Sequence, residues 1–454
     1  MDEEAAVKTT ALTTGGLLRG QEEAGVVVFR GVPYAACDRF GSPVPAPAWE
    51  GERQATVDGP IAPQLPSRLE PVMGVPEFHE QSENCLNLTI TTPAADDGCR
   101  PVLVWFHGGA WVSGAGGWRC YGGHRLARDG NVVVVAVDYR LGMLGYLRSR
   151  GVSEGNLGLA DQLAALEWVR DNIAAFGGNP DAVTIAGQSA GAHSVQCLLG
   201  MPKTRGLFRR AIIQSSPAGL GLGSARVARK AAARFLSYLG ADPKTASVSE
   251  ILGAQAKVAR AAAGRLGLNV ITGVNPVPGV GPLPDEAHWA HELDDRAPGL
   301  DVIIGTTARE MAAFYALNPT LQHLRRIPVL GPAIASTVER VVGSVAFGRP
   351  SRRLALRLSR NGGRVWMYRF DYAAPASPFG ATHCIELPFL FGADDDWTAV
   401  PMLAGADPRD IDTLGHQMRS AWLGFIRTGT PDTDPAWPRF TPTAPTVHHL
   451  GAAG

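Results

Sequence analysis

The sequence predicts an α/β protein with a central, mostly parallel sheet flanked by helices. Two observations predict this class. Short apolar runs recur along the chain, as is typical of strands buried on both faces, and helical patterns lie between them. Strands that alternate with helices favour parallel pairing, and the loops at the carboxyl ends of such strands form the natural site. Functional residues are therefore expected in those loops.

The clearest helical pattern covers residues 159–176, where apolar residues recur at steps of three and four until Gly177 and Gly178 end the helix. Residues 241–264 and 351–361 are also expected to be helical. The expected strands are 102–106, 132–137, 182–186, 211–214, 302–305 and 364–370.

Two segments are expected to be loops around the site. Residues 46–82 are rich in proline, which indicates surface loops near the mouth of the site. Residues 270–284 contain many glycines and prolines and resemble a loop that borders a pocket. No repeat, low-complexity tract or domain boundary is visible, so residues 1–454 are expected to form a single α/β domain with insertions around the active-site gorge.

Composition excludes several classes of protein. Hydrophobic residues make up 45% of the 454, which excludes a disordered or fibrous chain. The 42 basic and 42 acidic residues cancel, so no field attracts nucleic acid, an anionic membrane or strongly acidic substrates. The chain shows no signal peptide and no apolar run long enough to span a bilayer, which predicts a soluble, cytoplasmic protein. The six cysteines have no metal-ligand spacing, so neither a metal nor a cofactor is expected.

A serine motif carries the strongest functional signal. Residues 187–191 read G-x-S-x-G and stand between an apolar strand and an expected helix. In that context a sharp turn exposes the serine hydroxyl at the edge of the sheet. Gly187 and Gly191 fit because such a turn leaves no room for a Cβ atom. The motif therefore predicts Ser189 as a nucleophile.

A serine hydroxyl is a weak nucleophile at neutral pH, so it needs a general base and an acid that orients the base. In this type of fold these residues follow in the order serine, acid, histidine. Glu310 comes just after the apolar strand 302–305, and His383 lies in a loop before an apolar segment. We expect Ser189, Glu310 and His383 to form a catalytic triad.

Acyl transfer also requires N–H donors for the developing oxyanion. A strand runs into the glycine-rich turn His107-Gly108-Gly109-Ala110, whose backbone can approach a substrate closely. The expected donors are the backbone N–H groups of Gly109, Ala110 and Ala190, the residue after the nucleophile. His107 and Gly108 are expected to support the turn.

Six further segments resemble those of one known family: FRGVPY at 29–34, SENCLNL at 82–88, VDYRLGMLG at 137–145, NLGLADQ at 156–162, FGGNP at 176–180 and WLGFIRTGTP at 422–431. With them, the chain resembles the type-B carboxylesterase family of α/β-hydrolases, which includes para-nitrobenzyl esterases, carboxylesterases and cholinesterases. This resemblance implies the same serine, glutamate, histidine and oxyanion-hole residues that the motifs above predict.

The chain departs from the family pattern at several positions. Cys85 matches a cysteine that forms a disulfide in secreted members, but the partner position is Ala62, so no bridge is expected. Cholinesterases bind quaternary ammonium on a tryptophan before that cysteine, and residues 64–85 contain none, which disfavours choline esters.

Two departures lie next to predicted site residues. Arg309 and Met311 flank Glu310 where the family usually has aspartate and glycine, which predicts a changed loop or charge near His383. Ala110 replaces a third glycine in the oxyanion turn; its N–H group remains, and its methyl group narrows the acyl side.

Neighbouring polar residues are expected to be structural. Cys384 follows His383 but is expected to point elsewhere, and His193 and Ser194 are expected inside the helix after the nucleophile. Ser215 follows a strand and is expected to form a hydrogen bond behind the triad.

The predicted function is therefore hydrolysis of small to medium, largely apolar carboxylic esters through an acyl-enzyme. The partner is a small-molecule ester, without nucleic acid or membrane. Three alternatives stay open: amide, carbamate or lactone hydrolysis with the same triad, acyl transfer to an alcohol, and a non-catalytic binding protein of the same fold. The physiological substrate and the oligomeric state are not predicted.

Overall fold

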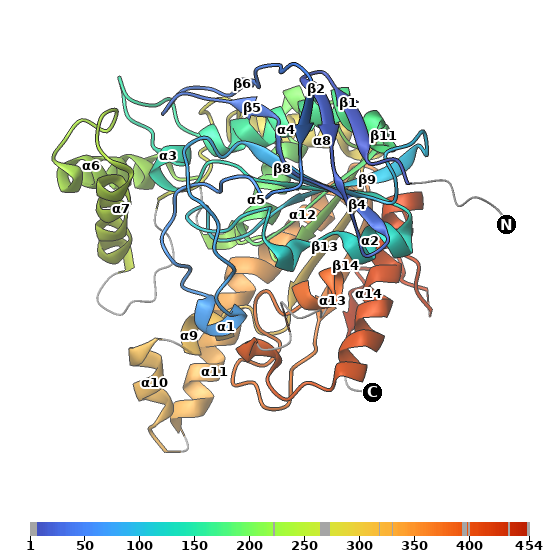
Figure 1. Cartoon of the computed structure of the whole chain (residues 1–454). Helices are drawn as coiled ribbons and strands as arrows, with labels where there is room; N and C mark the ends of the chain where they lie inside the picture. The colour runs from blue at the N-terminus through green and yellow to red at the C-terminus, as the bar shows by residue number, and fades with distance from the viewer. Residues whose placement is uncertain are drawn as a thin grey trace.

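A ten-stranded sheet forms the centre of the part of the chain that the structure describes (Figure 1). The structure is a computed structural model, and it describes residues 7–220, 223–263, 273–316, 318–328, 330–392, 397, 400–434 and 436–451. The strand order is β15-β14-β13-β12-β11-β9-β10-β8-β4-β3. The pairs from β15 to β10 are parallel, and β8, β4 and β3 continue the sheet in antiparallel fashion.

The predicted strands all lie in this sheet. The strands are β3 (Gln21–Glu23), β4 (Val26–Pro33), β8 (Asn87–Thr92), β9 (Arg100–Phe106), β10 (Val133–Val137), β11 (Gly178–Gln188), β12 (Arg210–Gln214), β13 (Asp301–Thr307), β14 (Arg364–Phe370) and β15 (His448–Leu450). A separate sheet at the amino-terminal end contains β1 (Thr10–Thr13), β2 (Gly16–Arg19) and β7 (Glu52–Gln54), and β5 (Ala35–Ala36) pairs with β6 (Val44–Pro45).

Alternate residues of the central strands enter two different cores. In β9, Val104 and Phe106 pack into one core and Leu103 and Trp105 into the other. This alternation follows from the two-residue period of a strand, and both faces are buried because helices cover both. The unbroken apolar runs therefore identify strands of a covered parallel sheet.

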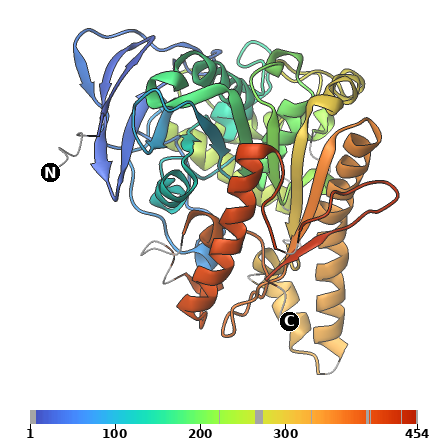
Figure 2. The same cartoon turned by 90° about the vertical axis from the view of Figure 1, so that its right-hand side faces the viewer.

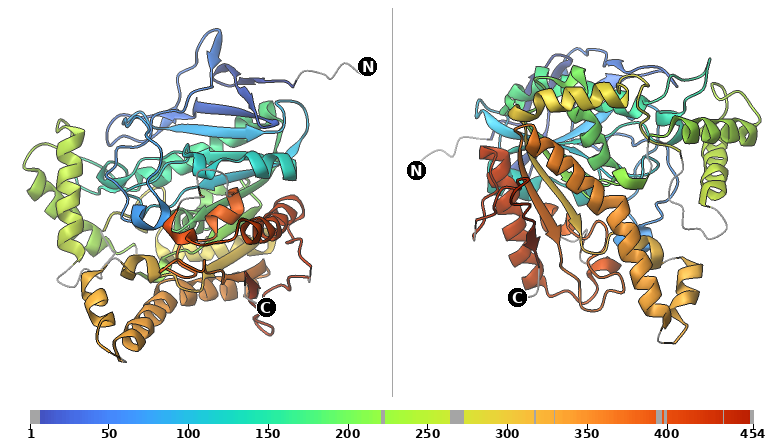
Figure 3. Two further views of the ribbon diagram at one scale, coloured as in Figure 1. Left: turned by 60° about the horizontal axis from the view of Figure 1, so that its bottom comes forward. Right: turned by 180° about the vertical axis from the view of Figure 1, so that it is seen from behind.

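Helices cover each face of the sheet. One face packs against α4 (Leu157–Asn172), α5 (Ala190–Leu199), α8 (Glu286–Arg296) and α12 (Arg349–Arg360). The other face packs against α2 (His124–Gly130), α13 (Leu387–Phe391) and α14 (Pro408–Thr428). Figure 2 shows α14 lying along its face of the sheet, and the view from behind in Figure 3 shows α12 on the opposite side.

Further helices lie away from the central sheet. α6 (Ala225–Leu239) and α7 (Val248–Ala263) form one pair, and α10 (Pro319–Arg325) and α11 (Leu330–Gly343) form a projecting pair (Figures 1 and 3). Shorter helical segments include α1 (Glu70–Met73), α3 (Gly142–Tyr146), α9 (Ala312–Ala316), a π-helical turn at Ser344–Gly348 and several 3₁₀ turns.

The helix expected at 159–176 is confirmed as α4 and a short 3₁₀ turn, Ile173–Phe176, before Gly177. The helix expected at 351–361 is confirmed as α12. The expectation for 241–264 is wrong at its start, because α7 begins at Val248. Ser247 and Glu250 exchange side-chain to backbone hydrogen bonds of 3.2 and 2.7 Å, a capping box that starts the helix there. Residue 264 lies outside the described residues.

Helix α6 is missing from the sequence predictions. Its buried face consists of Ala228, Ala231, Ala232 and Phe235. The positions beside them carry Arg226, Arg229, Lys230 and Arg234, so the helix is amphipathic, a pattern that the predictions missed.

The expected loops are found around the site. Residues 46–82 are mostly irregular, interrupted by β7 and α1. Residues 273–284 form a loop, and 270–272 lie outside the described residues. No helix in the described part of the chain has the length and hydropathy needed to cross a membrane.

Candidate active site

Ser189 occupies a sharp turn between β11 and α5. Its backbone has φ 57° and ψ −119°, a strained conformation for a residue other than glycine. The Ser189 N–H group donates to the Gln214 carbonyl at 2.8 Å. A Cβ atom added to Gly191 would lie 2.0 Å from the Phe106 carbonyl oxygen, and one added to Gly187 would lie 2.6 Å from the backbone of Gly191. The two glycines are thus required by close backbone packing.

Glu310 and His383 contact each other. His383 Nδ1 lies 2.6 Å from Glu310 Oε2, and both side chains are buried. The other carboxylate oxygen, Oε1, accepts hydrogen bonds from Ser215 Oγ at 2.6 Å and from the Thr307 N–H group at 2.8 Å. The carboxylate is therefore held by three donors, and the hydrogen bond expected of Ser215 is found.

Hydrogen bonds join the loop of Glu310 to the loop of His383. The Arg309 N–H group donates to the Ala381 carbonyl at 2.9 Å, and the Ala313 N–H group donates to Thr382 Oγ1 at 2.9 Å. Because these bonds lie on both sides of Glu310, they set its carboxylate against the imidazole.

The residues that flank Glu310 have partners of their own. Arg309 donates to both carboxylate oxygens of Glu339, at 2.7 and 2.8 Å. Met311 is buried in a small apolar cluster that includes Tyr315 and Phe347. The charge of Arg309 is therefore neutralised by Glu339 of α11, and Glu310 contacts His383.

The environment of His383 shifts its pKa upward. Burial alone lowers the pKa, but the adjacent Cys384 and the hydrogen-bonded Glu310 both raise it, and the pKa ends well above its ordinary value of 6.5. A carboxylate on Nδ1 also selects the tautomer in which Nε2 is free to accept a proton.

Gln188 contacts the other imidazole nitrogen. Its Nε2 atom lies 3.2 Å from His383 Nε2. With the Nδ1 proton directed at Glu310, the Gln188 amide donates to the lone pair of Nε2. This contact is absent from the sequence predictions, although Gln188 stands inside the G-x-S-x-G motif. No pattern in a single sequence reports which way that side chain turns.

The turn at 107–113 presents free backbone donors beside Ser189. Gly109 and Ala110 have φ values of 112° and 55°, and the Gly109 carbonyl accepts from the N–H groups of Val112 and Ser113 at 3.1 Å each. Within the described residues, the N–H groups of Gly109 and Ala110 make no hydrogen bond. The N–H group of Ala190 begins α5, where it has no partner within the helix.

His107 and Gly108 support this turn. His107 Nδ1 donates to the Gly108 carbonyl at 2.7 Å, and the ring stacks on Tyr139 with 4.4 Å between centroids. Burial lowers the pKa of His107 to about 4, so the ring is neutral at physiological pH. A Cβ atom on Gly108 would lie 3.3 Å from the Cβ of Ser189, which shows how closely the turn approaches the serine.

Two cavities adjoin Ser189. The larger compartment has a volume of about 380 Å³ and the smaller about 50 Å³. The larger compartment is lined mainly by apolar residues, among them Leu65, Leu69, Met73, Val112, Val258 and Val274. The smaller compartment is walled by Trp111, Leu220, Met311, Phe314 and Phe347. Both loops expected near the site thus contribute to its walls.

The remaining polar candidates have structural positions. His193 and Ser194 lie within α5, as expected. Cys384 lines the larger compartment, so the expectation that it points elsewhere is wrong; its backbone φ of 72° turns it there. All six cysteines lie in the described residues, and none of them, Cys85 included, forms a disulfide bond. The described residues include no cluster of histidine, cysteine or acidic side chains that would hold a metal ion.

Comparisons with known proteins agree with this architecture. The model of the carboxylesterase family matches residues 4–326 and 331–453. A probable N-octanoylanthranilate hydrolase of Rhodococcus erythropolis is 46% identical over 97% of each chain. The para-nitrobenzyl esterase of Bacillus subtilis is 36% identical over 94% of this chain and 92% of its own. A solved structure of PNB esterase superposes with a TM-score of 0.83 at 32% identity, covering 97% of this chain and 95% of its own.

The fold and these matches define a hydrolase of the α/β-hydrolase class. The chain belongs to the carboxylesterase family, and its activity is carboxylic ester hydrolysis.

Proposed function

We propose that Ser189, His383 and Glu310 carry out ester hydrolysis through an acyl-enzyme. The observation that supports this most strongly is the buried 2.6 Å contact between His383 and Glu310, since His383 also lies 3.2 Å from the side chain of Gln188, the residue before Ser189. The Ser189 hydroxyl attacks the ester carbonyl, and His383 Nε2 takes its proton. Glu310 holds the imidazole in the required tautomer and stabilises the imidazolium.

The oxyanion binds the N–H groups of Gly109, Ala110 and Ala190. Their lack of other partners supports this role, because donors that are already directed at the developing charge need no rearrangement during the reaction. His383 then protonates the leaving alcohol, and water repeats the cycle to release the acid. Gln188 must release His383 Nε2 for Ser189 to reach it, and Gln188 precedes Ser189 on the same turn.

The substrate class follows from the cavities. The apolar walls of the larger compartment suit a medium-length acyl chain or an aromatic group, which are stabilised there by burial. The name of one relative, a probable N-octanoylanthranilate hydrolase, contains an octanoyl group, which is an acyl chain of this size. In N-octanoylanthranilate that group is joined by an amide bond. N-octanoylanthranilate is therefore the second candidate substrate beside octanoyl esters.

Hydrolysis of para-nitrophenyl esters from acetate to decanoate, and of N-octanoylanthranilate, tests this proposal. We expect the highest kcat/KM for medium chains and complete loss in Ser189→Ala. Ser216→Ala is a matched control, since Ser216 bonds to Gln196 at 3.0 Å and not to the triad. Equal activity in the Ser189→Ala protein would refute the role of Ser189. Inactive but folded wild-type protein would instead favour the binding-protein alternative.

A small-molecule ester is thus the proposed partner. The single domain, the cytoplasmic location and the absence of nucleic-acid or membrane partners stay predictions of the sequence.

A further inference from the structure

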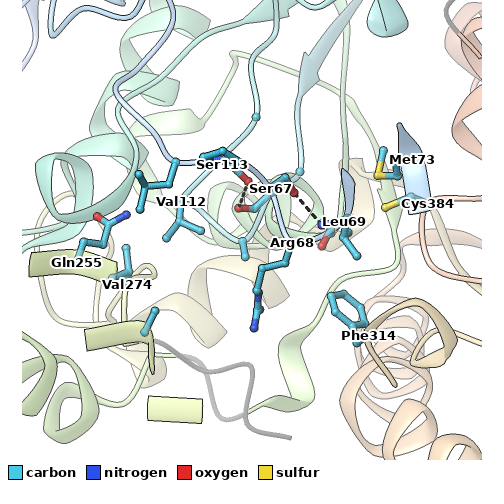
Figure 4. Close-up of a pocket in the computed structure, with 18 of the residues that line it drawn as sticks. Ser67, Arg68, Leu69, Met73, Val112, Ser113, Gln255, Val274, Phe314 and Cys384 are labelled. Carbon is cyan, nitrogen blue, oxygen red and sulfur yellow. Dashed lines mark hydrogen bonds between the residues drawn. The ribbon is translucent and has the colours of Figure 1, made fainter. Parts of the chain in front are cut away.

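Arg68 places a positive charge in the wall of both cavities beside Ser189. It lines the larger and the smaller compartment, together with Ala110, Val274 and Phe314. Figure 4 shows its side chain projecting between Val274 and Phe314. Arg68 therefore lies where the two compartments meet at the nucleophile.

The local backbone holds this arginine in place. The Leu69 N–H group donates to Ser67 Oγ at 3.2 Å, and the Ser67 N–H group donates to Glu70 Oε1 at 2.8 Å (Figure 4 shows the first of these). These bonds lead into α1, so Arg68 projects from an ordered turn.

No carboxylate of the described residues pairs with the guanidinium of Arg68. Within the described residues, Arg68 makes no hydrogen bond and no ion pair, although Arg309 and Arg140 are each paired with a carboxylate. Burial among the cavity atoms lowers the pKa of Arg68. Neither compartment has an acidic residue among its described lining residues, and the larger also contains Arg260. Arg68 is nevertheless exposed, so its guanidinium is open to a carboxylate of an incoming substrate.

We propose that Arg68 binds a carboxylate on the leaving group of the substrate. This inference rests on the proposed function. It narrows the substrate class to small aromatic acids that carry the acyl group on a hydroxyl or amino substituent, so that their carboxylate is free. The planar guanidinium can donate two parallel hydrogen bonds to a carboxylate, which fixes its position as well as its charge. The acyl chain then lies against the apolar walls of the larger compartment, and Ser189 attacks the carbonyl carbon that joins the acyl chain to the leaving group.

A matched pair of chromogenic esters tests this proposal. 4-Nitro-3-(octanoyloxy)benzoate carries a carboxylate, and 2-nitrophenyl octanoate lacks it but has the same acyl chain and nitrophenol. The measured quantity is the ratio of kcat/KM for the charged ester to that for the neutral ester. Differences in leaving-group reactivity cancel when this ratio is compared between variants.

We expect Arg68→Met to lower this ratio about tenfold, as for loss of a hydrogen-bonded charge pair, and Arg68→Lys to restore part of it. Added salt should lower the ratio in the wild type, since Arg68 remains in contact with solvent. The assignment would be overturned if Arg68→Met left this ratio at its wild-type value. It would also be overturned if Arg260→Met lowered the ratio and Arg68→Met did not.

Binding to the inactive Ser189→Ala protein separates this inference from the proposed function. Calorimetry should show tighter binding of the charged ester, with the preference lost when Arg68→Met is added. If the wild type hydrolyses neither ester but this preference is present, the function fails and the carboxylate site stands. If both esters are hydrolysed and bound equally, the carboxylate site fails and the function stands.

Discussion

Glu310 Oε2 lies 2.6 Å from His383 Nδ1, and the two side chains are only 4% and 1% exposed. A charged hydrogen bond in such a dry environment is stronger than one in water. It both orients the ring and determines how readily Nε2 takes a proton. Three predictions concern this site directly.

Glu310→Gln should lower kcat by roughly 10⁴, because the amide can donate to Nδ1 and so stabilise the wrong tautomer of the imidazole. Steady-state kinetics with para-nitrophenyl octanoate measure the effect, and circular dichroism establishes that the variant is folded. A near-normal kcat would exclude Glu310 from the triad.

Activity should rise with pH as His383 loses its proton, because only the neutral imidazole acts as a base. Since the pKa of His383 is raised well above 6.5, the acidic limb of the kcat/KM profile should lie above pH 6.5. Gln188→Glu places a carboxylate beside His383 Nε2, which stabilises the imidazolium. The acidic limb should then move to higher pH, by on the order of one unit.

Gln188→Met is the control for this shift, because it removes the amide and adds no charge. A Gln188→Glu profile that coincides with the wild-type profile would show that residue 188 does not contact the imidazole in solution.

Gly109→Ala should lower kcat by on the order of 10²-fold or more, the effect of losing an oxyanion donor. Its Cβ atom would lie 1.9 Å from the Ser113 carbonyl oxygen, and φ is 112°, so the turn must move. Gly117→Ala is the matched control, since a Cβ atom added there would lie 3.6 Å from its nearest neighbour, Asp138 Oδ2. Wild-type kcat in Gly109→Ala would exclude this turn from the oxyanion hole.

Arg140→Met should destabilise the fold by about 3–5 kcal/mol, because it leaves a buried carboxylate without its partner. Arg140 donates to both oxygens of Asp161, at 2.6 and 2.8 Å, and Asp161 is fully buried. Arg170→Met, which breaks the exposed pair with Asp171, should cost less than about 1 kcal/mol. Urea unfolding measures both values, and equal losses would contradict this account.

The sequence predicts the parts of the site that depend on backbone geometry. Gly187 and Gly191 must be glycines because other backbone atoms lie where a Cβ would be, and such constraints leave a recognisable motif. The apolar strands are equally visible, because both faces of the sheet are covered.

Contacts made by side chains across the fold are not visible in the sequence. Arg309 pairs with Glu339, thirty residues further along the chain, and Gln188 contacts His383 across 195 residues. The zero net charge likewise conceals Arg68, whose field acts within a cavity and not over the whole surface.

The central claim is that Ser189 carries the acyl group, and covalent labelling tests it most directly. Diethyl para-nitrophenyl phosphate should transfer its diethylphosphoryl group to the Ser189 oxygen and release para-nitrophenolate. Mass spectrometry of the digested protein should then find one label, on the peptide that contains Ser189, in step with loss of activity. Full inhibition with the label on another residue, or full activity with Ser189 labelled, would contradict the claim.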